Sequence, residues 1–482
     1  MDTIVVGNGI IALTVAFRLA KRAAATDHVT IVGPAARPGS ATMAAAAMLN
    51  SFAELDAASL DSEIGFQHFE LSHLASRRWP GFIKEILAVA GSLLPPGCAK
   101  CEGPCGGCFA LGTYLINNAA ADSLDDENFD AVVAALEKFD EPFERVSPRD
   151  IPNYQPEERQ RATRAVYIPN EGWINPRLLV EVLEAALSRF PQVSFIEGEV
   201  DRFIKPGARI EAAQLTDGRR LGGDRFVLAT GATVSGVLDR SELGIEVQRV
   251  FYGVGVSLEI RSPEFPHSKC IRTPNRGFVG GLYSVPYFTG PGEPTDHILI
   301  GATNFISPVP RPNGRVGSVE SLMRAAMEQI NSNFYRADLV RVNVGWRPTS
   351  QDTLPLVGKT SIDNLIIASG TKRDGLHLSP VLSEKVVAML YDEPTDPEFR
   401  LFDPERKPHK LLTREAAIRK GVRHLMSAAY QHGFAPAKSR MKDQVAAMYR
   451  QDLERLHDQV GAIDWGIPPD MFDMYRYGHA RG

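Results

Sequence analysis

The start of the chain shows the hydrophobic pattern of a strand, a tight turn, a helix and a second strand. Residues 3–6 are a β-branched apolar run, 7–9 read Gly-Asn-Gly, and 11–20 are helical in composition. Another short apolar run follows at 28–33. Short β-branched runs favour buried strands, whereas longer apolar stretches without Gly or Pro favour buried helices. The chain therefore opens with the order strand, helix, strand.

Later apolar segments predict strands of two kinds. Residues 223–235 and 364–370 read as buried strands that run into glycine turns. Residues 250–260 and 297–303 alternate between the two faces of a strand with a period of two, which is typical of antiparallel strands. Beyond about residue 400 the pattern becomes helical, near 412–430 and 437–458. We therefore expect two sheets of different character and a helical end.

The length of 482 residues is more than one ordinary core requires. We expect an α/β fold with two domains and an extension.

Composition narrows the class of protein. The chain is 44% hydrophobic and 23% charged, with a net charge of -5, which does not fit a nucleic-acid binder with an overall basic field. Its apolar runs are all shorter than the roughly 20 residues of a membrane span. The start reads as a strand and not as a signal peptide, so we expect a cytoplasmic protein with reduced cysteines and no membrane partner. Residues 405–450 carry an excess of roughly eight positive charges.

The first turn has the spacing G-x-G-x-x-G/A of a dinucleotide-binding loop. Gly7 permits the sharp turn, Gly9 lets a pyrophosphate approach the backbone, and Ala12 is the small residue where helix and strand pack. The helix N-terminus then favours phosphate. The second strand ends in Gly33, where an acid usually holds the ribose, so we expect backbone, water or a polar group such as Ser40 to replace that contact.

Three motifs farther along the chain resemble those of the D-amino acid oxidase family of flavoenzymes, most closely its glycine oxidase and sarcosine oxidase members. A run of small residues at 39–50 precedes them and allows close approach to a flat cofactor. Two family positions differ, with Thr371 in place of His and Asp374 in place of Asn. The matched positions are Tyr283, Val285, Pro286, Gly301, Ala302 and Thr303 in the first motif; Arg347, Pro348, Asp352, Pro355 and Gly358 in the second; and Gly370, Arg373, Gly375, Leu378 and Pro380 in the third.

The resemblance implies a Rossmann-like domain that binds FAD, an interleaved and mainly antiparallel substrate domain, and a helical C-terminal extension. The implied boundaries are 1–90, 150–245 and 335–400 for the FAD-binding domain, 91–149 and 246–334 for the substrate domain, and 401–482 for the extension. Gly375 would form a turn beside the flavin, with Ser379 capping the next helix and Pro380 in its first position. A helix N-terminus aimed at the flavin stabilises the negative charge of its reduced form. The implied cofactor-binding residues are Gly7, Gly9, Ile10, Ala12, Ser40, Thr42, Ala46, Ala47, Met48, Val200, Thr230, Gly231, Asp374, Gly375 and Leu376.

The same resemblance implies oxidation of an amine, such as an amino acid or an N-substituted amino acid, to an imine by hydride transfer to flavin N5, with oxygen as acceptor. The planar fork of Arg347 suits a substrate carboxylate, and Arg373 and Tyr283 would assist it. His377 reads as a packed helix-start residue and not as a base. Two alternatives remain open: a dehydrogenase that passes electrons through an iron-sulfur cluster to a protein partner, and a flavoenzyme that modifies a tRNA base.

Four of the five cysteines lie within eleven residues, as C-x2-C-x3-C-x2-C. Cys98, Cys101, Cys105 and Cys108 can form two chelating knuckles, whereas Cys270 stands alone and is expected to be buried. Three states stay open: one structural zinc ion, an iron-sulfur cluster, and free or paired thiols. We also expect that the C-terminal extension can serve as a contact between copies of the chain.

Overall fold

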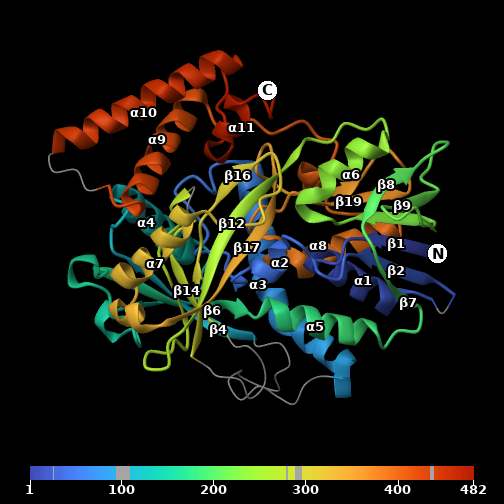
Figure 1. The fold of residues 1–482 in the computed structure, drawn as a ribbon, viewed down its shortest axis with the longest axis horizontal. Helices are drawn as coiled ribbons and strands as arrows, with labels where there is room; N and C mark the ends of the chain where they lie inside the picture. The colour runs from blue at the N-terminus through green and yellow to red at the C-terminus, as the bar shows by residue number, and fades with distance from the viewer. Residues whose placement is uncertain (25, 94–108, 278–279, 288–295, 435–438, 482) are drawn as a thin grey trace.

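The computed structural model describes residues 1–24, 26–93, 109–277, 280–287, 296–434 and 439–481 (Figure 1). Two large sheets organise these residues, and the C-terminal helices lie at one end of the molecule. The α/β fold predicted from the hydrophobic pattern is confirmed. No helix within the described ranges combines the length and the apolar character that a membrane crossing needs.

The first sheet has six strands in the order β18-β19-β11-β1-β2-β7. Its inner strands are parallel, and β18 joins one edge antiparallel to β19. Because β1 and β11 are parallel and in register, Val6 lies beside Leu228 and their carboxyl ends meet at one edge. The strands are β1 (Asp2–Val6), β2 (His28–Gly33), β7 (Val193–Glu197), β11 (Arg225–Leu228), β18 (Leu356–Lys359) and β19 (Leu365–Ser369).

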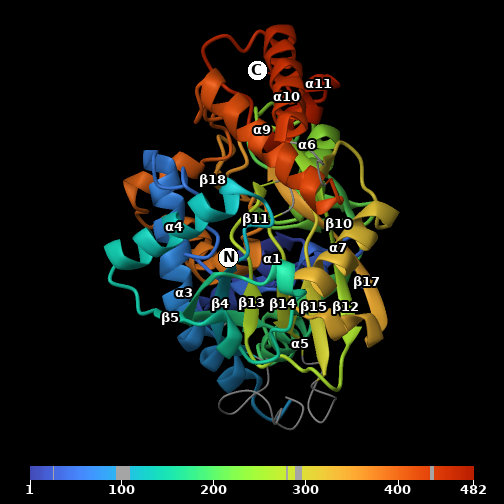
Figure 2. The ribbon, with the colours of Figure 1, turned by 90° about the vertical axis from the view of Figure 1, so that its left-hand side faces the viewer.

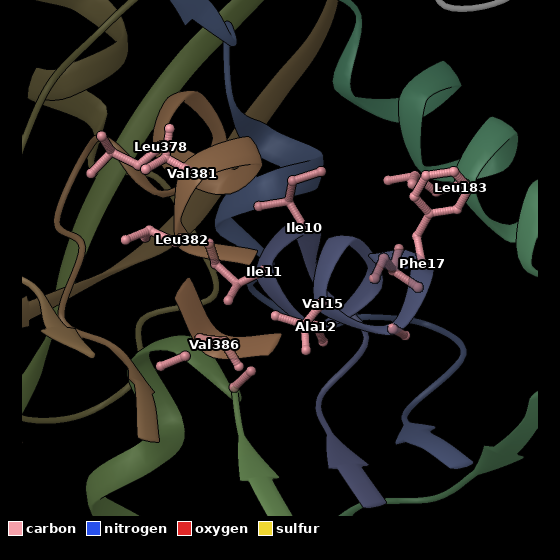
Figure 3. Close-up of a cluster of buried hydrophobic side chains, with 14 of the residues drawn as sticks. Ile10, Ile11, Ala12, Val15, Phe17, Leu183, Leu378, Val381, Leu382 and Val386 are labelled. Atoms are coloured by element: carbon pink, nitrogen blue, oxygen red, sulfur yellow. The ribbon is translucent and has the colours of Figure 1, made fainter. Parts of the chain in front are cut away.

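Helix α1 (Ile10–Arg22) is buried between α8 (Gly375–Leu390) and α5 (Pro176–Leu187), as Figure 3 shows. Ile11 faces α8, and Phe17 lies beside Leu183 of α5. Helix α1 is apolar around most of its circumference, which is the pattern expected of a helix in the centre of a core. This core holds the first turn of α1 in a fixed place against the sheet.

The second sheet has ten strands, and its longest pair is β12 (Val250–Arg261) with β17 (Asp338–Ser350). Strand β12 is buried on both faces, so the expected alternation of buried and exposed positions is absent there. Val256, Leu258 and Ile260 belong to a buried core that includes Leu322, whereas Phe251, on the opposite face, packs against the C-terminal helices. The other members are β3 (Met48–Leu49), β4 (Phe109–Asn117), β5 (Glu144–Val146), β6 (Arg164–Ile174), β13 (Cys270–Arg272), β14 (Tyr283–Pro286), β15 (His297–Gly301) and β16 (Phe305–Ser307).

Sheet membership differs from the predicted domain boundaries at three strands. Strands β3, β6 and β17 lie in segments predicted for the nucleotide-binding part but belong to the ten-stranded sheet. They are held there by antiparallel pairing of β3 with β6, of β6 with β4 and of β17 with β12. A small sheet consists of β8 (Val200–Ile204), β9 (Ala212–Leu215) and β10 (Arg220–Gly222), and the remaining early helices are α2 (Ala41–Ala44), α3 (Glu63–Ala90), α4 (Ser123–Lys138), α6 (Val234–Ser241) and α7 (Val316–Gln329).

The C-terminal extension is helical, as predicted, and contains α9 (Arg414–Gln431), α10 (Ser439–Val460) and α11 (Phe472–Arg476). Figures 1 and 2 both place these helices at the same end of the molecule, next to the ten-stranded sheet. A buried cluster joins Ile418, Leu453 and Met471 of the extension to Phe251 of β12. The extension is therefore packed onto the body by its own apolar core.

Candidate active site

A cavity of about 480 Å³ opens at the carboxyl ends of β1 and β11. Open parallel sheets bind ligands at this edge. Strands β12 and β17 of the second sheet contribute Gly255 and Arg347 to its opposite wall. One cavity thus joins the nucleotide-binding turn to the residues predicted to hold a substrate.

Gly7 forms the turn at the nucleotide end of the cavity. Its φ is +120°, and a Cβ there would lie 2.3 Å from the carbonyl oxygen of Ala229. Only glycine lets β1 turn into α1 so close to β11. Gly9 is the N-cap of α1 and has no side chain to cap the helix, so the N–H groups of the first turn border the cavity without a cap from Gly9. The N–H of Ile10 donates to Thr42 Oγ1 at 3.1 Å.

Gly33 stands at the end of β2, where an acid that holds the ribose was expected. The side chain of Asn8 occupies the space that a side chain at this position would need. A Cβ on Gly33 would lie 2.5 Å from Asn8 Cγ, and Asn8 Nδ2 donates to the carbonyl oxygen of Pro34 at 2.9 Å. Arg37 lines the same end, where its Nε donates to the carbonyl oxygen of Asn8 at 3.1 Å and its guanidinium pairs with Glu184. This end of the cavity therefore presents a guanidinium where a carboxylate was expected, and sequence reasoning missed both Asn8 and Arg37.

Ser40 lines this end of the cavity too, but its hydroxyl already has a structural partner. Ser40 Oγ accepts a hydrogen bond from Met43 N at 3.3 Å and caps α2. The hydroxyl hydrogen is still available to donate to a ligand. The contact of Ser40 with a ribose stays a prediction.

The middle of the cavity fits an anionic dinucleotide such as FAD. Thr230 lines it, and its hydroxyl is buried without a hydrogen-bond partner among the described residues. The N-terminus of α8 at Gly375 borders the cavity as well, so two helix N-termini face it from two sides. The predicted residues that line the cavity are Gly7, Gly9, Ile10, Ser40, Thr42, Val200, Thr230, Gly231, Tyr283, Arg347, Arg373, Gly375 and Leu376.

Helix α8 begins earlier than the sequence pattern suggested. Asp374 is its N-cap, and Leu378 N donates to the carbonyl oxygen of Asp374 at 2.8 Å. Ser379 and Pro380 therefore lie inside the helix, which corrects their expected places as cap and first residue. Pro380 is the sixth residue of α8 and lacks an N–H, so the helix loses the hydrogen bond that this residue would otherwise donate to the carbonyl oxygen of Leu376.

Five residues expected to contact the cofactor do not line the cavity. Ala12 is buried in the core beneath the first turn. Ala46 and Met48 pack against Trp173 of the second sheet, and Ala47 belongs to the core around α1. Asp374 points to His68, with 3.4 Å between Oδ2 and Nε2. Their side chains thus support the walls, and their contacts with the cofactor stay predictions.

Arg347 lies at the substrate end of the cavity on β17. Its Nη1 donates to the carbonyl oxygen of Thr303 at 2.9 Å and to Asn304 Oδ1 at 3.1 Å. The guanidinium lies over Gly255, where a Cβ would come within 2.3 Å of Cζ. Burial lowers the pKa of Arg347, although an arginine keeps its charge in a protein. Among the described residues its Nε and Nη2 make no hydrogen bond, so that edge is available to a ligand.

Tyr283 and Arg373 complete this end. The ring of Tyr283 lies over Gly301, and burial raises the pKa of its phenol, which therefore stays a neutral donor. Burial opposes the charge of Arg373, but Glu54 and Asp470 raise its pKa. Within the described part of the chain, neither Arg347 nor Arg373 has an ion pair within 4.0 Å. Two guanidinium groups thus line the cavity without a carboxylate partner.

The nearby acids are already paired with other cations. Glu54 contacts Arg272 at 2.6 Å, and Asp470 contacts Lys372 at 2.9 Å. Burial would raise the pKa of Glu54, but Arg272 and Arg373 hold it below its usual range. Sequence reasoning missed Glu54, Lys372 and Asp470. Lys372 lies within the third motif and could have been predicted from it. Nothing in the sequence indicates that Asp470 lies at this end of the cavity.

The structure confirms the packing role of His377 and the burial of Cys270. His377 is buried in α8, with 2.9 Å between its Nε2 and the carbonyl oxygen of Ser72. Cys270 is a free, buried cysteine, and burial raises the pKa of its thiol. The four clustered cysteines, Cys98, Cys101, Cys105 and Cys108, lie outside the described residues. Elsewhere in the described chain no cluster of three metal-binding side chains occurs.

Residues 2–389 match the model of a family described as FAD dependent oxidoreductase, the DAO family. The chain therefore belongs to this family of FAD-dependent oxidoreductases. The glycine oxidase of Geobacillus kaustophilus has the same fold, with a TM-score of 0.68 at 21% identity over 84% of this chain and 98% of that one. The C-terminal extension lies beyond the matched residues.

Two curated relatives match smaller parts. The glycine oxidase of Pseudomonas putida is 30% identical over 210 residues, which is 43% of this chain and 52% of that protein. The tRNA 5-methylaminomethyl-2-thiouridine biosynthesis bifunctional protein MnmC of Idiomarina loihiensis is 27% identical over 252 residues, which is 50% of this chain and 38% of that protein. The matched regions thus span about a third to a half of the curated relatives.

Proposed function

We propose that this chain oxidises an amine that carries a carboxylate, such as an amino acid or an N-substituted amino acid, to an imine. The observation that carries this proposal is the free edge of Arg347 at the substrate end of the cavity. A guanidinium with Nε and Nη2 available binds a carboxylate through two parallel hydrogen bonds. A neutral substrate would leave this buried charge without a partner, which is costly.

The other residues at this end would orient the substrate. The phenol of Tyr283 stays protonated and can donate to the same carboxylate. Arg373 adds a second charge that holds anionic groups in the cavity. FAD, when bound, accepts a hydride from the carbon that bears the amine. The chain's contribution is then to fix that carbon in place and to exclude water, and no side-chain base is needed for this step.

Oxygen is the proposed electron acceptor, and the imine would hydrolyse after release. The test is an aerobic assay for hydrogen peroxide with matched pairs of amines that do and do not carry a carboxylate. We expect peroxide from amines with a carboxylate and much less from their partners without one. Equal rates for both members of each pair would contradict the role proposed for Arg347.

An amine dehydrogenase is the second candidate, because the segment C-x2-C-x3-C-x2-C can hold an iron-sulfur cluster. Electrons would then leave through the cluster to a protein partner, and little peroxide would form. The same cysteines can instead hold one structural zinc ion. Elemental analysis of protein purified without oxygen separates these states: iron with sulfide supports the dehydrogenase, zinc supports a structural site, and metal-free protein supports neither.

A tRNA-modifying role is the third candidate, favoured by the relative named for tRNA biosynthesis and by the basic extension. The structure uses part of this positive charge internally. Lys420 pairs with Asp56 at 2.8 Å, Arg423 with Glu127 at 2.5 Å, and Lys442 with Asp122. These pairs attach the extension to the body, which leaves less charge for phosphates. Strongly salt-dependent RNA binding would support this candidate.

A further inference from the structure

The C-terminal extension reaches the substrate end of the cavity, although it lies outside the residues that match the family. The contact is made by Asp470, in a short 3-10 helix at Pro469–Met471 just before α11. Its Oδ2 lies 2.9 Å from Lys372 Nζ, and its Oδ1 accepts a hydrogen bond from Asn304 Nδ2 at 3.3 Å. Asn304 in turn contacts Arg347.

These contacts fix the orientation of the Asn304 amide. Because Nδ2 donates to Asp470, the oxygen Oδ1 faces Arg347 and accepts from its Nη1 at 3.1 Å. Nη1 also donates to the carbonyl oxygen of Thr303. The Nη1 side of the guanidinium is thereby held against the wall, which presents the edge formed by Nε and Nη2 to the cavity. We propose that Asp470 is a positioning residue, which makes the C-terminal extension part of the carboxylate-binding site.

The charge of Asp470 is as important as its geometry. Arg347, Lys372 and Arg373 all line one cavity, and like charges at close range destabilise each other. Burial would raise the pKa of Asp470, but Lys372 and Arg373 lower it to about 2. Its carboxylate is therefore ionised under all ordinary conditions. It neutralises Lys372 and leaves the two arginines for the substrate.

The extension holds Asp470 firmly in place. Its neighbour Met471 is fully buried in the cluster that includes Phe251. Elsewhere in the extension, the ring of His424 lies over Gly277, and Lys420 pairs with Asp56. These contacts and the buried Met471 attach the extension to the body, and so they hold the short helix that carries Asp470.

The test is the substitution Asp470→Asn, which keeps the shape and removes the charge. This proposal rests on the proposed carboxylate-dependent oxidation, so each protein is assayed with a matched pair of amines, with and without a carboxylate. For the carboxylate-bearing amine we expect KM to rise about tenfold or more and kcat to change much less. The dissociation constant of propionate, read from the flavin spectrum, should rise by a similar factor.

The matched control is Asp452→Asn, because Asp452 also forms an ion pair within the extension, at 2.7 Å from Arg476, but away from the cavity. It should leave KM and propionate binding unchanged. Asn304→Ala removes the amide that links Asp470 to Arg347 and should also raise KM, and the double variant should lose less than the sum of the two single losses. A double-variant loss equal to that sum would mean that the two residues act separately, and it would contradict a connection from Asp470 through Asn304 to Arg347.

Two further results would overturn the inference. Unchanged KM and propionate binding in Asp470→Asn, with a normal carboxylate preference in the parent, would remove Asp470 from the site and leave the proposed function standing. An equal loss in Asp452→Asn would show a general effect of the extension. A parent enzyme without any carboxylate preference would overturn the proposed function itself, and this outcome is visible before any variant is made.

Discussion

Arg347 is the residue on which the proposed chemistry depends most. Its guanidinium is held on one side by Thr303 and Asn304, and it lies over Gly255, so its position is set before a substrate arrives. Such fixed geometry lowers the entropy lost on binding. Lysine has a single charged point and cannot reproduce a two-point contact with a carboxylate.

We predict that Arg347→Ala lowers kcat/KM. The loss should correspond to about 2 to 4 kcal/mol of transition-state stabilisation, because a charged hydrogen-bond partner is lost. Arg347→Lys should recover part of this loss. Steady-state kinetics with a carboxylate-bearing amine measure both, and the FAD content of each variant is the control. Equal activity in Arg347→Ala and the parent would remove Arg347 from the site.

Glu171 offers a second test at the scale of one residue. It is fully buried, and its Oε1 accepts hydrogen bonds from the N–H groups of Ser51 at 2.7 Å and Phe52 at 2.6 Å. Burial raises its pKa from 4.5 to about 7, against the opposing effect of Arg272. Between these two pH values the folded state binds more protons than the unfolded state, so stability falls as the pH rises.

We predict that Glu171→Gln removes this pH dependence, because an amide does not ionise. The wild-type free energy of unfolding should fall by about 3 kcal/mol from this group between pH 4.5 and pH 7, and the variant should show a flatter curve. Urea unfolding at several pH values measures it, with exposed Glu246→Gln as the control. Parallel curves for wild type and Glu171→Gln would contradict the buried, protonated state.

At the scale of single residues, the sequence could predict those site residues that lie within a recognisable motif. Gly7, Arg347 and Arg373 were identified because a motif surrounds each one. Asn8, Asn304 and Asp470 were missed because their roles depend on neighbours far away in the chain. Ser379 was assigned wrongly, since a Ser-Pro pair resembles a helix start even where the helix begins at Gly375.

At the scale of elements, the first turn and α1 determine how a nucleotide can bind. The two glycines of the turn, Gly7 and Gly9, differ in backbone conformation and in surroundings. Gly7 has a positive φ and lies against β11, whereas Gly9 has an ordinary extended conformation and only Thr42 Oγ1 near a Cβ, at 3.5 Å. The fold therefore requires Gly7, while Gly9 matters for what approaches the backbone.

We predict that Gly7→Ala lowers both protein stability and FAD binding, because its Cβ would overlap the backbone of Ala229. Gly9→Ala should keep the melting temperature of the apoprotein and weaken FAD binding. Gly218→Ala is the control for strain alone, since Gly218 has a φ of +90° with open space around it. Thermal unfolding and FAD titration decide the matter, and intact FAD binding by Gly9→Ala would place the pyrophosphate elsewhere.

The sequence predicted most elements where the hydrophobic pattern is strong. The opening strand and helix, β2, α9 and α10 all appear close to their expected positions. The period-two alternation failed for β12, because helices cover the face that would otherwise meet solvent. Pairing partners such as β6 and β17 could not be predicted, since sheet membership depends on contacts between distant segments.

At the scale of the whole molecule, the extension is joined to the family motifs by a buried ion pair. Arg406 contacts Asp352 at 2.9 Å, and both side chains are almost inaccessible. Asp352 also accepts hydrogen bonds from Ser350 and from the N–H of His409. Breaking such a pair leaves a buried charge without a partner, which destabilises far more than losing a surface pair.

We predict that Arg406→Gln lowers the free energy of unfolding by about 3 to 5 kcal/mol, because Asp352 loses its cation. The exposed pair of Arg249 with Asp239 is the control, and Arg249→Gln should cost about 1 kcal/mol or less. Chemical denaturation of both variants gives the comparison. Similar small effects for the two would mean that the extension is attached mainly by its apolar cluster.

The central claim is that an amine with a carboxylate is oxidised in the cavity beneath Arg347. The most direct measurement is anaerobic mixing of the FAD-loaded protein with matched amines while the visible flavin absorbance is followed. Amino acids or N-substituted amino acids should bleach the flavin, their analogues without a carboxylate should not, and Arg347→Ala should abolish the difference. Flavin that no carboxylate-bearing amine bleaches, or that both classes bleach equally, would contradict the account.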